Sequence, residues 1–223
     1  TLDATFYCRD IRDLTGTRTD EIAIFGGAST YSKYENSDFA FVKGIVLSMN
    51  YFDLEGLSLN MNYTLQQAKG TASSPSQAWS SSQGGGVAET YMIPLDWDQL
   101  HTLSMIMSYN QSNYGISLIG KIGSGLPYTP SSDNNISILV QNSEQKPITS
   151  TFDIRSYYLL NIGGNSVQVY LNISNLFNNL NHTNVYNDSG VADYTTYESD
   201  AINQNTGEYV NSIQEWFNNE TFY

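Results

Sequence analysis

Residues 151–178, TFDIRSYYLLNIGGNSVQVYLNISNLFN, decide the fold. Two runs of alternating apolar and polar side chains lie on either side of a Gly-Gly-Asn segment at 163–165. Alternation with a period of two predicts β-strands, and a Gly-rich segment between two such runs predicts a tight turn, so the stretch is a β-hairpin. Its strands are roughly 9–11 residues long, the length of a tilted strand that crosses a bilayer. Soluble strands average about 5–6 residues.

Each strand of this hairpin has an apolar and a polar face. The apolar face is interrupted only by Ser156 and otherwise consists of Phe152, Ile154, Tyr158, Leu160, Val167, Val169, Leu171 and Ile173. The opposite face carries Asp153, Arg155, Tyr157, Leu159, Asn161, Gln168, Tyr170, Asn172 and Ser174. In a membrane wall the first face would contact lipid and the second would line the lumen.

The composition fits either a membrane barrel or a secreted β-sandwich. The 223 residues are 40% hydrophobic and only 14% charged, with 17 Tyr, 17 Gly and a mean hydropathy of -0.34. No apolar run approaches the roughly 20 residues of a membrane helix. The strands of a membrane barrel alternate polar with apolar residues and have little net hydrophobicity, so this low mean value does not exclude a barrel.

The charge distribution argues against some partners. The net charge is -13, and Arg155 is the last Lys or Arg in the chain, so the acidic C-terminal end repels nucleic acid. We interpret the acidic end as a solvated loop rather than a divalent-cation site, because its carboxylates have no fixed ligand spacing. Cys8 is the only cysteine and cannot form an internal disulfide.

Five further strands repeat the pattern of the hairpin, which makes seven in all. We expect them at residues 1–14, 39–52, 57–69 and 100–109, and from 114 to the GSGLPYTP segment. The alternation is clearest in the third, where one face carries Leu57, Leu59, Met61, Tyr63 and Leu65.

The connections between the strands alternate strictly in length. Long connections are expected at about 15–38, 70–98, 127–150 and 179–223, and short ones at 53–56, 110–113 and 163–165. A β-sandwich has no reason to place every long loop at one end, whereas an outer-membrane barrel has short periplasmic turns and long extracellular loops. Seven strands cannot close an up-and-down barrel without leaving unpaired backbone groups in lipid. We therefore expect an all-β, transmembrane, antiparallel up-and-down β-barrel of which this chain is a fragment.

Five short motifs, taken in order, resemble one protein family. DIRDL at 10–14, PLDWDQLHT at 94–102, GSGLPYTP at 123–130, FDIRSYY at 152–158 and NISNLFN at 172–178 are similar to the last third of the barrel of TonB-dependent outer-membrane receptors, especially those of Bacteroidetes-type bacteria. Leu100 departs from the pattern, since the family more often carries Arg before the His-Thr pair. The resemblance implies a 22-stranded barrel, with residues 1–223 forming its C-terminal portion and the plug domain and closing strand outside this chain.

The resemblance also implies active import rather than enzymatic activity. Such receptors lie in the bacterial outer membrane and import a scarce nutrient such as a siderophore, cobalamin or a carbohydrate. They release it inward when TonB pulls on the plug. The implied partners are therefore the protein's own plug domain, TonB through that plug, outer-membrane lipid and, on the loops, a possible surface lipoprotein. No cofactor is implied.

Two groups of residues are candidates for ligand contact. The lumen-facing candidates, which could instead pair the wall with the plug, are Lys121, Asp153, Arg155, Tyr170 and Asn172. The extracellular-loop candidates, which could stack on sugars or aromatic chelators, are Trp79, Trp97, Tyr128 and Trp216. Tyrosines nearest the strand ends, namely Tyr63, Tyr109 and Tyr114, are better explained as an interfacial girdle. His101 and His182 lack further ligands at metal spacing, so no metal site is predicted.

Two alternatives to the importer remain open. An extracellular β-sandwich adhesin or carbohydrate-binding module would be a soluble monomer that buries the same apolar residues in its interior. An outer-membrane hydrolase would need a nucleophile and base, or an acid pair, converging at the rim. The two histidines offer poor support for the hydrolase.

Overall fold

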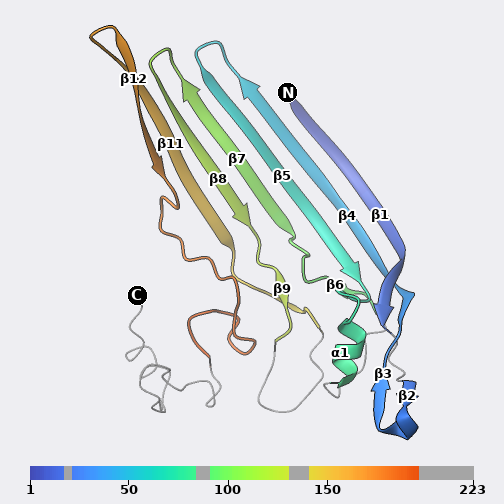
Figure 1. The fold of residues 1–223 in the computed structure, drawn as a ribbon. Coiled ribbons are helices and arrows are strands. Elements are labelled where there is room, and N and C mark those ends of the chain that lie inside the picture. Colours follow the sequence, from blue (N-terminus) through green and yellow to red (C-terminus); the bar gives the residue numbers. More distant parts are fainter. Residues whose placement is uncertain (18–21, 84–90, 131–140, 196–223) are drawn as a thin grey trace, which may run out of the picture.

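A computed structural model describes residues 1–17, 22–83, 91–130 and 141–195. Seven long strands lie side by side in one antiparallel sheet, in the order of the chain (Figure 1). They are β1 (Leu2–Thr17), β4 (Tyr34–Phe52), β5 (Leu57–Gly70), β7 (His101–Asn110), β8 (Tyr114–Gly123), β11 (Thr149–Ile162) and β12 (Asn165–Ile173). The all-β, up-and-down sheet of seven long strands is confirmed.

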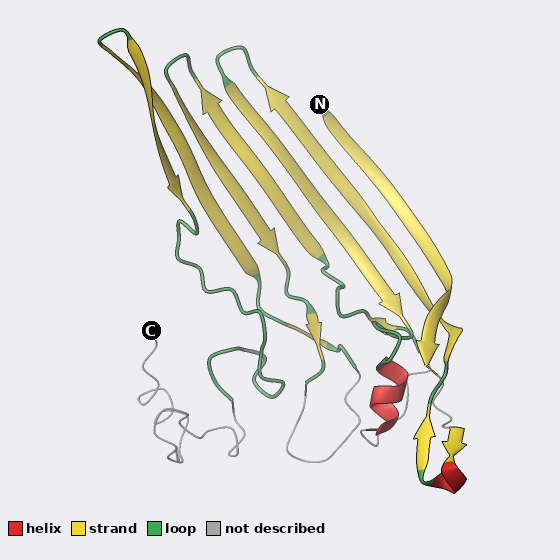
Figure 2. Ribbon diagram, in the orientation of Figure 1, coloured by secondary structure: helices red, strands yellow, loops and turns green. Residues whose placement is uncertain are grey.

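The connections differ sharply between the two ends of the sheet, as predicted. Figure 2 shows the three short turns at the end where the N-terminus lies, while the long connections lie at the opposite end. In the last turn Gly163 and Gly164 have φ of 59° and 84°, values that side chains disfavour and that suit a tight hairpin turn.

The long connections contain short elements that the alternation did not predict. β2 (Ile22–Ile24), the 3-10 turn η1 (Phe25–Gly27) and β3 (Ser29–Tyr31) form a small hairpin before β4, which begins at Tyr34 rather than 39. The next connection, expected to be irregular, contains helix α1 (Gln77–Gln83) and β6 (Ile93–Pro94), which pairs with the end of β5. β9 (Pro127–Tyr128) pairs with β10 (Glu144–Gln145).

The strand register places the residues that were predicted to face lipid on one face of the seven-stranded sheet. Cα pairing runs from Leu2 through Met49, Met61 and Met105 to Gly120, and the latter pairs with Phe152. Paired residues point to the same side of a sheet, so each cross-strand row lies on one face. We call this side, with the residues predicted to face lipid, the apolar face.

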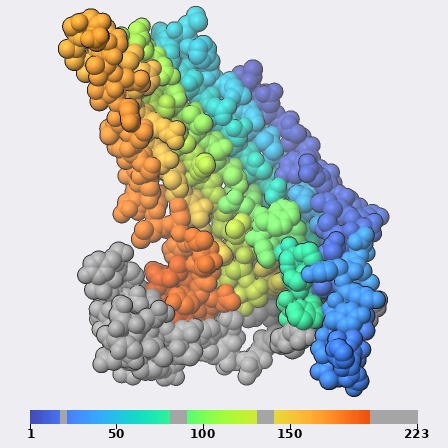
Figure 3. Space-filling model, viewed as in Figure 1, coloured from blue at the N-terminus to red at the C-terminus, as the bar shows by residue number. Residues whose placement is uncertain are grey.

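The apolar face is uncovered in the described part of the chain. Leu2, Phe6, Val169 and Leu171 expose 76%, 74%, 54% and 56% of their surface. In the space-filling view the strands follow one another across the face in view (Figure 3). A β-sandwich would bury these side chains against a second sheet, so the sheet is not built as a sandwich within the described residues.

The opposite side, which we call the polar face, carries side-chain hydrogen bonds within and between neighbouring strands. Asn62 donates to Asn60 at 3.0 Å, Asn60 donates to Asn50, and Ser108 donates to Ser117 at 2.8 Å. These amides and hydroxyls satisfy one another without a second protein layer.

The small buried core lies on the polar face at the end with the long connections. The segment that follows β6 folds back so that Leu95, 2% exposed, packs with Ala40, Val42 and Ala68. Leu95 donates its backbone N–H to the Ala68 carbonyl at 3.0 Å. The core thus attaches the 71–100 connection to β4 and β5 and positions it over the polar face.

Asp98 is a buried carboxylate at the margin of this core. It is 7% exposed, and its Oδ1 accepts the backbone N–H of Ala68 at 2.7 Å. Burial raises the pKa of Asp98 above its usual 3.8, against the opposing effects of the Ala68 hydrogen bond and the Lys69 charge.

We therefore expect Asp98→Asn to remove a pH-dependent loss of stability. A raised pKa in the folded state gives stability that is complete below the unfolded pKa and is lost as the pH rises through the folded pKa. The wild type should lose thermal stability as the pH rises from about 4, and the Asn variant, which keeps the acceptor oxygen, should lose less. Circular dichroism melts across this range measure the difference. Asp3→Asn is the exposed control, and parallel curves for wild type and Asp98→Asn would contradict the assignment.

Candidate functional site

The five lumen-facing candidates all lie on the polar face of β8, β11 and β12. Arg155 pairs directly with Asn172 and with Ser117, and Tyr170 pairs with Tyr157. Lys121 pairs with Thr151, two rows nearer the long connections than Arg155. The candidates therefore form a stripe along the sheet rather than one cluster. Their contact with a ligand or plug stays a prediction.

Lys121 lies in a hollow of about 480 Å³ near the long connections. Gly123 forms its floor, and a side chain there would collide with Gln99. The polar-face residues around Lys121 in this hollow are Gln99, Thr102, Ser104, Thr149 and Thr151. Sequence reasoning did not select these five, because isolated Ser, Thr and Gln residues carry no spacing signal before the register brings them together.

The hollow combines one cation with several neutral hydrogen-bonding groups. Thr102 donates to Gln99 Oε1 at 3.1 Å, and Gln99 Nε2 donates to the Ser124 carbonyl at 2.9 Å, which fixes the amide. Lys121 has no ion pair with any described residue. A free ammonium among hydroxyls suits a carboxylate, a phosphate or a hydroxyl-rich ligand.

Asp153 has a structural contact that sequence reasoning missed. Its Oδ1 accepts the backbone N–H of Asn175 at 2.8 Å, and Leu176 donates its N–H to the Phe152 carbonyl at 2.6 Å. The rings of Phe152 and Phe177 meet edge to face, with centroids 5.3 Å apart. The FDIRSYY and NISNLFN motifs therefore hold each other where the chain leaves β12.

The left-handed backbone explains the asparagines of this turn. Asn175 and Asn178 have φ of 51° and 52°, a conformation that Asn tolerates better than most residues. Asn175 Oδ1 accepts the N–H of Asn179 at 3.0 Å. Asn179 in turn donates to Ser150 Oγ at 2.8 Å, which returns the chain to the start of β11.

The loop candidates come from different connections at the same end of the sheet. Trp79 is in α1, Trp97 follows β6 and Tyr128 is in β9 (Figure 1), while Trp216 lies outside the described residues. Trp97 is 47% exposed. Tyr128 packs beneath Gly190, and burial, together with Glu144 and Asp188, raises the pKa of its phenol. Stacking of these rings on a ligand stays a prediction.

Hydrogen bonds join the long connections to one another. The buried Asn142 donates to the Pro94 carbonyl at 2.8 Å and to Asp96 Oδ1 at 2.7 Å. The backbone N–H of Asp96 donates to Ser73 Oγ at 2.9 Å, and Lys146 donates to the Thr183 carbonyl at 3.0 Å. These bonds tie segments from three connections into one layer beyond the ends of the strands.

Tyrosines gather near the short turns on the apolar face. The rings of Tyr109 and Tyr114 lie 6.2 Å apart, and those of Tyr114 and Tyr158 stack at 6.5 Å. Tyr63 lies toward the other end, where its hydroxyl is 2.8 Å from His101 Nδ1. The cluster at the short turns is typical of an aromatic girdle at one edge of an apolar band. The girdle role of Tyr63 stays a prediction.

Metal-ligating side chains do not gather anywhere among the described residues, since no group of three or more His, Cys, Asp or Glu could hold an ion. No helix in the described ranges is long and apolar enough to cross a membrane.

Comparison with known proteins identifies the architecture. No protein-family model and no curated protein sequence matches the chain. The crystal structure of the outer-membrane transporter YddB from Escherichia coli matches it with a TM-score of 0.56 and 13% identity, over 80% of this chain and 26% of the transporter chain. At this identity the likeness shows a shared fold, the antiparallel up-and-down sheet that part of that transporter also has. The chain spans about a quarter of the length of the transporter that it matches.

We expect Asp153→Ala to loosen the turn after β12, because the Asn175 N–H loses its acceptor. Removing the acceptor should cost roughly 1–3 kcal/mol locally, whereas Asp153→Asn keeps an oxygen there and should cost less. Amide hydrogen exchange at Asn175 and Leu176 reports the change directly. Equal exchange in wild type and Asp153→Ala would show that Asp153 does not hold the turn.

Proposed function

We propose that this chain forms part of the wall of an outer-membrane barrel that imports a scarce nutrient. The observation that carries the proposal is the combination of a continuous uncovered apolar face with long connections at only one end of the sheet. Lipid is the solvent that makes such a face stable, and outer-membrane barrels have this loop asymmetry. The fold likeness to an outer-membrane transporter supports the same function.

The dimensions of the apolar face fit a bilayer. On β5 the apolar residues run from Leu57 to Leu65, a span of roughly 26 Å at about 3.3 Å per residue. A tilt of about 35–45° makes this span roughly 19–22 Å tall, close to the apolar band of about 25 Å in such barrels. The tyrosines near the short turns would then lie at the periplasmic interface, with the long connections outside the cell.

The energy source and partners follow from the sequence resemblance. The five ordered motifs support a TonB-dependent receptor, whose plug would contact the polar face and transmit the pull of TonB. Arg155, Tyr170 and Asn172 are the wall residues that could contact that plug. Among the lumen-facing candidates, Lys121 and its hollow lie nearest to the long connections, which are exterior in the proposed orientation. We propose transport rather than catalysis, with a siderophore, cobalamin or a carbohydrate as cargo and with a surface lipoprotein as a possible partner on the loops.

Uptake by a deletion strain tests the proposal. Cells that lack the gene should fail to accumulate one of these three cargo classes when it is scarce, and the intact gene should restore accumulation. A protonophore should abolish the restored uptake, because TonB draws on the inner-membrane proton gradient. Uptake of every cargo class at wild-type rates without the gene would overturn the import function. Restored uptake that resists the protonophore would overturn TonB dependence alone.

A further inference from the structure

The hollow around Lys121 lies where five parts of the chain meet. Its floor is formed by β7, β8 and β11, while Gln99 enters from the connection before β7 and Asn181 from the segment after β12. Its volume of about 480 Å³ lies within the range of ligand pockets, roughly 300–1,000 Å³. Among the described residues that line it, Lys121 is the only charged one and none is aromatic.

The two amides at the rim of this hollow are held in place by hydrogen bonds. Asn181 donates to the Ser150 carbonyl at 3.0 Å and accepts the Ser150 N–H at 2.8 Å. Gln99 is fixed between the Thr102 hydroxyl and the Ser124 carbonyl. An amide oxygen can accept two hydrogen bonds, so each of these two can accept one more from a ligand. Because both side chains are already ordered, a ligand binds them without the entropic cost of fixing them.

The charge of Lys121 is not balanced within the described part of the chain. Lys121 makes no hydrogen bond or ion pair with a described residue. Its diagonal neighbour on β11 is Asp153, whose Oδ1 accepts the Asn175 N–H at 2.8 Å instead. Acids outnumber Lys and Arg by 22 to 9 in the whole chain. An anionic ligand is therefore repelled by most of the surface and attracted to a local cation such as this one.

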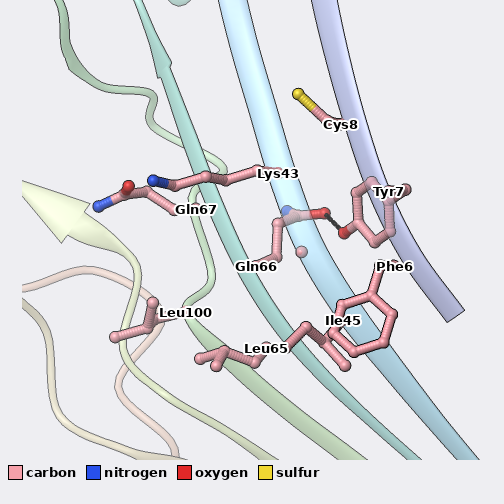
Figure 4. Close-up of a pocket in the computed structure, with 10 residues that line it drawn as sticks. Phe6, Tyr7, Cys8, Lys43, Ile45, Leu65, Gln66, Gln67 and Leu100 are labelled. Atoms are coloured by element: carbon pink, nitrogen blue, oxygen red, sulfur yellow. Dashed lines mark hydrogen bonds between the residues drawn. The ribbon is translucent and has the colours of Figure 1, made fainter. Parts of the chain in front are cut away.

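Lys43 provides a contrast of equal charge in other surroundings. It lies in a hollow of about 560 Å³ whose lining includes Phe6, Ile45 and Leu65 on the apolar face (Figure 4). Those side chains offer no partner to a hydroxyl group. Lys121 stands among threonine and serine hydroxyls and two amides, which both donate and accept hydrogen bonds. Sugar hydroxyls do the same, so only the hollow around Lys121 is complementary to a sugar ring.

We propose that the hollow around Lys121 binds a uronic acid unit, which makes an acidic oligosaccharide the cargo. The inference rests on the proposed function, because the polar face borders an import path only in a barrel wall. The Lys121 ammonium donates to the carboxylate. The ring hydroxyls exchange hydrogen bonds with the side chains of Ser104 and Thr149 and with the two rim amides.

The balance of charge and the lining exclude other kinds of anion. A phosphate group carries about −1.5 to −2 charges at pH 7, so a single lysine would leave part of that charge unpaired. Arginine forks and clusters of cations are the usual partners of phosphate. An aromatic chelator would stack on aromatic side chains, which the described lining lacks. One carboxylate on a hydroxyl-rich ring matches both the single cation and the neutral polar groups.

Isothermal titration calorimetry on the complete protein in detergent tests the site. The probes are short oligomers of galacturonate and of glucuronate, together with their methyl esters, which keep the hydroxyls but carry no charge. The wild type should bind one of the acids roughly tenfold more tightly than its ester, as expected for a charge-assisted hydrogen bond. Lys121→Met should bind the acid as weakly as the ester, and Lys121→Arg should keep the preference for the acid.

Two further variants separate the charge from the hydroxyls and from general effects. Ser104→Ala removes a neutral hydrogen-bonding group, so it should weaken the acid and the ester by the same factor, roughly 2- to 10-fold. The control is Lys43→Gln, which removes an equal charge from the apolar face and should leave both affinities unchanged.

The outcomes distinguish the site from the import function. The uronate site is overturned if the wild type binds none of the acids, binds acid and ester equally, or shares its preference for the acid with Lys121→Met. Import of another cargo would then still stand. If Lys121 does confer the preference but cells without the gene accumulate the acidic oligosaccharide at wild-type rates, the site stands and the import function fails.

Discussion

Hydrogen bonds between antiparallel neighbours hold seven long strands in one register from β1 to β12, and the two faces of the sheet depend on that register. The side-chain period of a strand is two residues, so a slip by one residue between any two strands would move the apolar side chains of one strand onto the polar face. The pairing runs along the interior strands and shifts register only between Ile11 and Thr15 of β1 among the described long strands, which leaves few backbone groups unpaired in an apolar surrounding. The ladder thus produces both a wall that lipid can cover and a hydrogen-bonded polar surface on its other side.

The polar face shows how the wall and the long connections support each other. Leu95 packs on Ala68, and Asp98 accepts the N–H of the same residue, so the connection after β5 returns to the strand that it left. Near the opposite edge of the sheet, Asp153 likewise fixes a connection to the strand ends, because it accepts the backbone N–H of Asn175 in the turn after β12. Ligand-contacting residues on mobile loops need a rigid scaffold, and these contacts fix where the connections begin.

Much of the fold could be predicted from alternation and turn residues alone. The strand from Leu57 to Lys69 and the hairpin around Gly163 lie where the pattern put them, because a half-exposed strand keeps a strict period of two. The hairpin of β2 and β3, the helix α1 and the extension of β4 to Tyr34 were missed. Those segments are short and rich in Gly, Ser or Tyr, so they carry too little alternation to predict. The β2–β3 hairpin is held by its own strand pairing, and α1 lies against β1.

The candidate site was less predictable than the fold. The positions of Lys121 and Arg155 in the alternating pattern indicated which face they lie on. The hollow around Lys121, however, depends on Gln99 and Thr149, which are distant in sequence and are brought together only by the strand register. Asp153 looked like a free lumenal charge, and its actual partner is a backbone N–H in a motif twenty-two residues later. Contacts between a side chain and a distant backbone group leave no periodic signal.

Spin labels on adjacent residues of β5 test most directly whether the apolar face contacts lipid. Cysteines replace Met61 and Asn62 one at a time in a Cys8→Ser background, and the label's collision rates with oxygen and with a water-soluble nickel chelate are measured in bilayers. We predict that the label at 61 collides mainly with oxygen and the label at 62 mainly with the chelate. Protection of position 61 from both reagents, or the reverse pattern at the two positions, would contradict a lipid-facing wall.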